Sequence, residues 1–225
     1  EPEPPAPDHP LLARPEVIAT PHLGAATDQA QLNVAIAVAE QVRDYLLHGT
    51  VRNAVNLPSV SAIELTELRP LIDLGEKLGL FQGQVCKTFR EIDIEYAGHV
   101  AELNVQPISL AVLRGVLAPW VGSRVNGVNA AHIAHQHGIR VIGAKAPQTE
   151  DFVSLITVRV KTNHGEHRVS GTIFGRTQPR IVRVDDYRLE AMPQGPTLLI
   201  RNRDLPGVVG RVGMTLGNAQ LNISR

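Results

Sequence analysis

The chain has 225 residues, of which 43% are hydrophobic and 20% charged, and its 22 basic side chains balance its 22 acidic ones. This composition is typical of a folded globular protein and excludes extensive disorder. A formal net charge of zero and an aromatic content of 4% provide neither the basic surface nor the stacking rings that nucleic-acid binding needs. We therefore expect no nucleic-acid partner.

The cysteine content, the hydrophobic runs and the first residues of the chain indicate where the protein resides and whether it is part of a longer one. The single cysteine, Cys86, can form no disulfide within the chain, which suits a reducing cytoplasm. The longest hydrophobic run covers residues 34–39, whereas a membrane-spanning helix needs about 20 residues. The chain opens with neither a methionine nor a basic and apolar leader. We expect a cytoplasmic protein without a membrane span, and a piece of a longer one.

The first part of the chain predicts a loop, a short strand and a long helix. Six prolines in the first fifteen residues favour an extended surface loop. Residues 17–19 predict a short buried strand. Thr27 and Asp28 are a typical helix start, and apolar residues then recur at helical spacing until Gly49. The pattern predicts a helix from about residue 27 to Gly49.

The middle of the chain predicts a unit of helices and strands. Ile92, Ile94 and Tyr96 alternate with acidic residues, which is the two-residue period of a half-buried strand. Residues 103–105 are expected to continue or bulge this strand, and residues 163–165 predict a hairpin turn. The expected helices cover about 64–80, 108–118 and 127–137, and the expected strands also include 140–144, 153–160, 167–174 and 180–184.

The last part predicts the beginning of a separate unit. The glycine and proline at residues 195–196 indicate a boundary between domains, and residues 197–201 predict a strand. Residues 206–207 open a predicted helix of about twelve residues, and residues 221–223 predict a second strand. The elements together predict a mixed α/β and α+β fold in three parts, residues 1–58, 59–193 and 196–225.

His22 is the strongest candidate for a catalytic side chain. It follows Pro21 at the end of a predicted strand and precedes a helix start, and Gly24 leaves the backbone there open to a ligand. An imidazole titrates near pH 6.5 and can accept a proton from a substrate hydroxyl. The alternative is an ordinary structural histidine. The acidic residues that could orient the ring are Glu1, Glu3, Asp8 and Glu16.

Two further clusters contain side chains that can bind ligands. Four cations of the middle unit could bind an anion, since guanidinium groups favour phosphate and carboxylate, although solvated surface charge is the alternative. These cations are Arg114, Lys145, Arg176 and Arg180. His132 and His135 share a helical face that His137 does not, and no carboxylate or thiol completes a ligand set, so no metal is expected.

Several segments resemble a known enzyme family. Residues 17–27, with Gln31 four residues later, resemble the histidine-bearing signature of the D-isomer-specific 2-hydroxyacid dehydrogenases. Residues 1–12 are similar to the glutamate loop that precedes this signature. Segments 54–58, 170–175, 179–182 and 204–210 then follow in the order seen in the long-form phosphoglycerate dehydrogenases of that family. The resemblance covers essentially the whole chain.

The resemblance implies a reaction and a site. His22 would act as the acid/base on the C2 hydroxyl while hydride passes to NAD, and Glu3 would orient it, with Glu1 as the weaker choice. The residues against the nicotinamide end of NAD would be His22, Leu23, Gly24 and Ala25. The whole enzyme would oxidise 3-phospho-D-glycerate to 3-phosphooxypyruvate at the start of serine biosynthesis, as a cytoplasmic homo-oligomer, a dimer or a tetramer.

The resemblance also assigns the three parts. Residues 1–58 would end the catalytic region, residues 59–193 would form an intervening domain, and residues 196–225 would begin a ferredoxin-like ACT domain. In that domain Asn202 and Asp204 would stand at the positions that bind serine as an inhibitor.

The family's glycine-rich dinucleotide loop and substrate-clamping arginine find no match in the chain. The nearest pattern, Gly207, Gly210 and Gly213, has the wrong spacing for a pyrophosphate turn. We therefore expect this chain to be inactive by itself. The alternatives are a freestanding regulatory or oligomerisation module that binds an amino acid or anionic effector, and a dehydrogenase of another 2-hydroxy acid.

Overall fold

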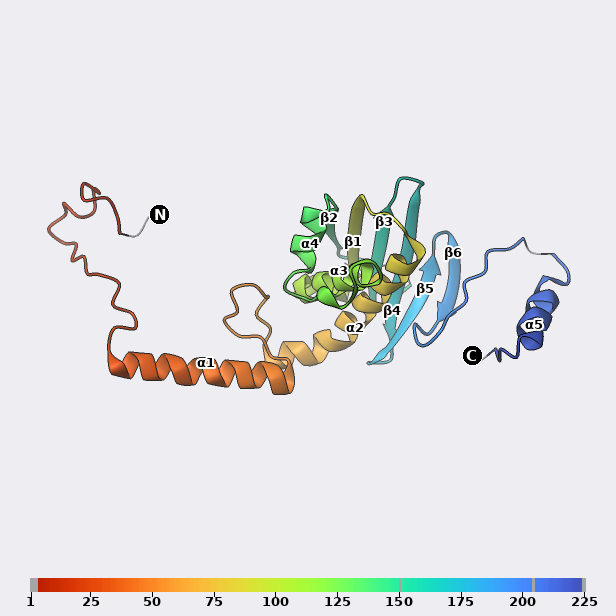
Figure 1. Ribbon diagram of the computed structural model, residues 1–225, viewed down its shortest axis with the longest axis horizontal. Helices are drawn as coiled ribbons and strands as arrows, with labels where there is room; N and C mark the ends of the chain where they lie inside the picture. Colours follow the sequence, from red (N-terminus) through yellow and green to blue (C-terminus); the bar gives the residue numbers. More distant parts are fainter. Residues whose placement is uncertain (1–3, 150, 204, 224–225) are drawn as a thin grey trace. The chain divides into compact units, whose positions relative to one another are not determined.

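The structure is a computed structural model that describes residues 4–149, 151–203 and 205–223 (Figure 1). The chain divides into two compact units, Glu1–Met192 and Pro193–Arg225. The helices are α1 Asp28–His48, α2 Ala62–Val85, α3 Gln106–Val121, α4 Ala130–Gln136 and α5 Val208–Asn218, with the short 3-10 helices η1 His99–Glu102 and η2 Gly122–Arg124. The strands are β1 Glu91–Gly98, β2 Arg140–Ala146, β3 Ser154–Lys161, β4 Glu166–Phe174, β5 Gln178–Val184 and β6 Tyr187–Ala191.

Helix α1 confirms the predicted helix and its caps. The Thr27 hydroxyl oxygen accepts a hydrogen bond from the Ala30 N–H at 3.2 Å, which satisfies one of the free donors at the helix start. At the other end Gly49 takes the left-handed conformation, with φ of 72°, and donates to the Tyr45 carbonyl oxygen. No residue of α1 is buried.

Six strands form one sheet in the order β2-β1-β3-β4-β5-β6. β1 and β2 run parallel, and each of the other neighbours pairs antiparallel. α2 and α3 cover one face of this sheet (Figure 1). The strands predicted at about 92–96, 140–144, 153–160, 167–174 and 180–184 are confirmed. The hairpin turn is confirmed too, where the Thr162 N–H donates to the Gly165 carbonyl oxygen at 2.8 Å.

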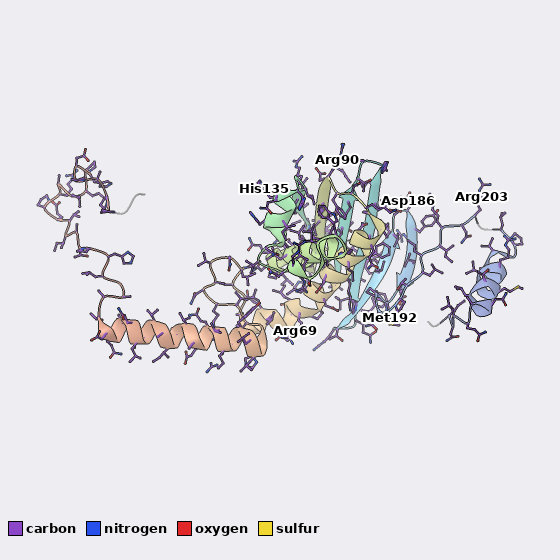
Figure 2. The ribbon with its side chains drawn as sticks, viewed as in Figure 1. Arg69, Arg90, His135, Asp186, Met192 and Arg203 are labelled. Carbon is purple, nitrogen blue, oxygen red and sulfur yellow. The ribbon has the colours of Figure 1, made fainter. Side chains whose placement is uncertain are left out.

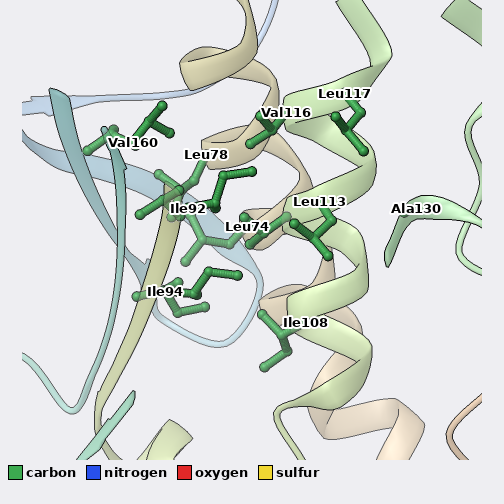
Figure 3. Packing of buried hydrophobic residues seen from close by; sticks show 14 of the residues in the cluster. Leu74, Leu78, Ile92, Ile94, Ile108, Leu113, Val116, Leu117, Ala130 and Val160 are labelled. Atoms are coloured by element: carbon green, nitrogen blue, oxygen red, sulfur yellow. The ribbon is translucent and has the colours of Figure 1, made fainter. Parts of the chain in front are cut away.

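The core lies between the sheet and the two long helices (Figure 3). Ile92, Ile94 and Tyr96 of β1 are fully buried, as their alternation predicts. They pack in one apolar cluster with buried residues of α2, α3 and the neighbouring strands. This cluster includes Leu74, Leu78, Ile108, Val112, Val116, Leu117, Val158 and Val160.

α2 and α3 touch each other backbone to backbone. A Cβ on Gly79 would collide with the Val112 carbonyl oxygen, and a Cβ on Gly115 would collide with the Glu76 carbonyl oxygen. Only glycine allows two helices to approach this closely. The two glycines therefore lie inside the contact between α2 and α3, and α2 continues past Gly79 to Val85, beyond the predicted end at about residue 80.

Four expectations about local structure were wrong. Residues 103–105 do not continue β1, because the chain turns into η1 after Gly98, which has φ of 76°. Residues 17–19, 197–201 and 221–223 form no strand among the described residues. A strand is defined by hydrogen bonds to a neighbour, and no other described segment pairs with these three.

The second unit contains one helix among its described residues. α5 begins directly after Gly207, which has φ of 85°, and confirms the predicted helix. The rest of residues 193–203 and 205–223 has no regular strand or helix.

Candidate functional site

His22 lies on an exposed segment that ends in a tight turn. The Ala26 N–H donates to the Leu23 carbonyl oxygen at 3.1 Å, which closes the turn just before the N-cap of α1. The His22 ring lies against Gly24, since a Cβ built on Gly24 would be 3.8 Å from the His22 Nε2. All residues from His22 to Ala25 are exposed. The structure thus brings His22, Leu23, Gly24 and Ala25 together on an accessible turn.

The carboxylate partner of His22 stays a prediction. Glu3 and the weaker candidate Glu1 lie outside the described residues. Asp204 of the second unit also lies outside them, and its expected companion Asn202 is on an exposed segment without regular structure.

The four cations that the sequence suggested as an anion site lie on different elements. Arg114 is on α3, Lys145 on β2, Arg180 on β5, and Arg176 in the turn that joins β4 and β5. Three strands, β1, β3 and β4, separate β2 from β5 in the sheet. The structure therefore does not bring Lys145 and Arg180 together.

Lys145 and Arg180 each have contacts of their own. The Lys145 ammonium donates to the Leu103 carbonyl oxygen at 3.0 Å. The Arg180 guanidinium donates to a Glu190 carboxylate oxygen at 3.4 Å and lies 5.6 Å from the centre of the Phe174 ring. Each cation therefore has a structural partner besides solvent.

Arg114 borders an apolar cavity that the sequence did not indicate. Its guanidinium forms an ion pair with Glu76, and its Nε atom is buried without a hydrogen-bond partner among the described residues. The cavity has a volume of about 290 Å³. Its lining, which holds one charged residue in the described part of the chain, is Tyr45, Gly49, Val51, Leu57, Pro58, Val60, Leu65, Ile72, Pro107, Leu110, Ala111, Arg114 and Gly127.

Cys86 packs inside the protein as a structural residue. It is buried at the end of α2, and burial, together with the charge of Asp185, raises the pKa of its thiol to about 11. Because the thiolate is the reactive form, the structure gives this cysteine no role as a nucleophile.

One cluster around a histidine was not predicted from the sequence. His99 of η1 contacts Glu67 of α2 through Nε2 at 2.8 Å and Glu102 through Nδ1 at 3.2 Å. These hydrogen bonds to Glu67 and Glu102 raise the pKa of His99. His99 and Glu67 are far apart in the sequence, so only the fold could reveal the contact.

The described residues form neither a metal-ligand cluster nor a membrane-spanning helix. Within the described ranges, no three ligand side chains gather as a metal ion requires. None of the described helices is both long and apolar enough to cross a membrane.

Comparisons with known proteins identify the family. The model of the D-3-phosphoglycerate dehydrogenase intervening domain matches residues 67–185. A D-3-phosphoglycerate dehydrogenase of Synechocystis is 38% identical over 92% of this chain and 38% of its own length. Enzymes of that name from Archaeoglobus fulgidus and Bacillus subtilis are 35% and 36% identical over 100% of this chain and 42% and 43% of their own lengths.

The chain thus spans about two fifths of these relatives. The matched residues 67–185 run from the first half of α2 to the end of β5, and so take in most of the sheet and the helices packed on it. This chain belongs to the D-3-phosphoglycerate dehydrogenase family and contains the family's intervening domain.

Proposed function

We propose that these residues are part of an NAD-dependent D-3-phosphoglycerate dehydrogenase that oxidises 3-phospho-D-glycerate to 3-phosphooxypyruvate, the entry step of serine biosynthesis. The observation that carries the proposal is the match to enzymes of that name along the whole chain, including His22 and its turn. The proposed enzyme is a cytoplasmic homo-oligomer.

His22 is the proposed acid/base. In the oxidation, the C2 hydrogen leaves as hydride, the hydroxyl proton passes to the His22 imidazole, and the carbon becomes a ketone. NAD, when bound, accepts the hydride at its nicotinamide ring. An accessible imidazole on a fixed turn suits this proton transfer. Glu3 is proposed to hold the imidazole in the orientation that receives the proton.

The exposure of the turn at His22 supports a proposed contact with the nicotinamide of NAD. The residues of this turn, His22, Leu23, Gly24 and Ala25, are exposed, and Gly24 has no side chain to keep a flat ring away from the backbone. We propose that these residues contact the nicotinamide end of NAD and leave the rest of the cofactor to other parts of the enzyme.

The test is an assay of NAD reduction by the full-length protein that contains these residues. We expect reduction that depends on 3-phosphoglycerate and is much slower with D-lactate or D-glycerate. The 225-residue chain should reduce no NAD, since it holds no glycine-rich dinucleotide turn with the spacing of the family. A full-length protein that prefers another 2-hydroxy acid would overturn the substrate assignment.

Effector binding is a second candidate function, favoured by the apolar cavity beside Arg114 and by the likeness of residues 196–225 to an ACT domain. Two sites are proposed for a small anionic ligand or serine, the cavity and the residues Asn202 and Asp204. Calorimetric titration of the chain with serine and with phosphate tests this, and Arg114→Met and Asn202→Ala distinguish the sites. Binding of neither ligand would remove the candidate.

A further inference from the structure

The two edges of the sheet differ in their protection against pairing with another strand. β6 has five residues and pairs with β5 through a shifted register between Ile181 and Arg183. Short strands and irregular pairing are devices that keep a sheet edge from accepting a further strand. β2 has neither device. It is seven residues long and pairs with β1 in an unbroken register from Arg140 to Ala146.

The outer edge of β2 presents unpaired backbone groups. The Arg140 N–H donates to the carbonyl oxygen of Arg90, which is labelled in Figure 2 just before β1. In a parallel pair the backbone groups of alternate residues point to the same neighbour, so Val141, Gly143 and Lys145 direct their N–H and C=O groups away from β1. No strand in the described part of the chain pairs with this edge.

The side chains along this edge offer no obstacle. Val141, Gly143, Ala144 and Lys145 are exposed, and a Cβ on Gly143 would meet no atom within 4 Å. The strand contains no proline, the ammonium of its one lysine is bound to the Leu103 carbonyl oxygen, and the guanidinium of Arg140 lies 3.6 Å from a Glu91 carboxylate oxygen. An exposed, regular edge strand of this kind is a template for pairing with a further strand.

We propose that β2 pairs antiparallel with β2 of a second copy of this chain, across a two-fold axis at Gly143. We choose this axis because it places each residue whose backbone groups point outward opposite another such residue of the second copy. Gly143 faces Gly143 of the second copy, and Val141 faces Lys145 in two equivalent pairs. Each such pair exchanges two hydrogen bonds, so about six new ladder bonds form and two six-stranded sheets become one.

Charge supports a second copy as the occupant. Across the Gly143 axis, Lys145 lies opposite Val141 and Arg140 lies opposite Ala146, so neither cation faces a like charge. On the face that Arg140 and Ala146 share, Ile142 also lies opposite Ala144, which places apolar side chains together. Like charges directly opposite each other would destabilise the pairing, and this register has none.

A matched pair of substitutions at one position tests the proposal. Val141 is exposed to 39%, so either charge is tolerated in the isolated chain. Because the axis creates two equivalent pairs of position 141 with Lys145, Val141→Lys would place two like charges opposite each other in each pair. Val141→Glu would place opposite charges there. We expect the lysine variant to weaken dimerisation about tenfold and the glutamate variant to tighten it by a similar factor, as measured by sedimentation velocity of the 225-residue chain.

A cross-link locates the axis independently of any other contact between copies. Hydrogen-bonded antiparallel pairs have Cα atoms about 5.5 Å apart, within disulfide range. Mild oxidation should therefore convert Gly143→Cys to a covalent dimer. His164→Cys, in the exposed turn between β3 and β4, is the matched control and should stay monomeric on a non-reducing gel.

Circular dichroism of each variant checks that the fold is retained. The proposal is overturned if Gly143→Cys cross-links no faster than His164→Cys, or if the two charged variants at Val141 associate equally. Either result would show that β2 does not pair with β2 of a second copy, so that its edge is unpaired or binds a different protein.

Discussion

Gln82 is the residue that ties α2 to the sheet by hydrogen bonds. Its side chain is 1% exposed, and its Nε2 donates to the carbonyl oxygens of Val158 at 2.8 Å and His167 at 3.0 Å. A buried carbonyl that loses its donor costs roughly 1 to 3 kcal/mol. The helix predicted over about 64–80 ended before Gln82, and its two carbonyl partners lie far away in the sequence, so this contact could be recognised only from the packed structure.

We predict that Gln82→Leu lowers the free energy of unfolding by about 2 to 4 kcal/mol, because it leaves both carbonyl oxygens without this donor. The measurement is urea denaturation followed by circular dichroism. Gln84→Leu, on the exposed side of the same helix, is the control and should change stability by under about 0.5 kcal/mol. Equal stability of the two variants would remove Gln82 from this role.

His99 gives a pH-dependent contact between α2 and η1. Hydrogen bonds from the His99 ring to the carboxylates of Glu67 and Glu102 raise the pKa of His99 in the folded chain, so the folded state binds the proton more tightly than the unfolded state. The stabilisation is fully present below about pH 6.5, the ordinary value, and is lost as the pH rises through the raised pKa.

We predict that Glu67→Gln lowers the titration midpoint of His99, as followed by NMR of its ring protons. Glu166→Gln, an exposed acidic residue on β4, should leave that midpoint unchanged. An identical His99 midpoint in wild type and Glu67→Gln would show that the hydrogen bond does not form in solution.

At the scale of elements, the contact between α2 and α3 sets how closely the helical layer packs. Gly79 and Gly115 each lie against the backbone of the other helix, whereas a Cβ on Gly75 would meet the Ile108 side chain first, at 3.0 Å, and the Ile108 carbonyl oxygen at 3.3 Å. A side chain can turn away from a new methyl group, but backbone can yield only by moving a whole helix.

We predict that Gly79→Ala destabilises the chain by about 3 kcal/mol, near the upper end of overpacking costs, and that Gly75→Ala costs about 1 kcal/mol or less because alanine favours the helix. Thermal unfolding of both variants measures this. If the two melt together, the close backbone contact does not govern the stability of this layer.

The sequence predicted elements well where the signal is local. Thr27 and Gly49 mark both ends of α1 through contacts within a few residues. The capping box of Ser61 and Glu64, in which each side chain accepts from the other's backbone N–H, is also local. The prediction did not use this capping box, and it therefore placed the start of α2 at about residue 64 instead of Ala62. β6 was missed too, although Tyr187 and Leu189 alternate with charged residues.

Long-range structure was beyond the sequence for a physical reason. The strands expected at 17–19, 197–201 and 221–223 have suitable residues, but strand formation depends on a partner that local composition does not identify. Lys145 and Arg180 were grouped because both are cations, and strand order then placed three strands between them.

At the scale of the whole molecule, the family follows from the comparisons and the catalytic assignment rests on His22. Its motif was readable because the histidine, the glycine and the helix cap are neighbours in sequence, and the structure places all of them on one exposed turn. The Glu3 contact and the three-part domain division stay predictions.

The most direct test is His22→Ala in the full-length enzyme, with NAD reduction by 3-phosphoglycerate as the readout. Removing a general base should lower kcat about 100- to 10,000-fold, and added imidazole should restore part of the rate because it replaces the lost base. His164→Ala, on an exposed turn, should keep the wild-type kcat. Turnover of His22→Ala at the wild-type rate would contradict the account.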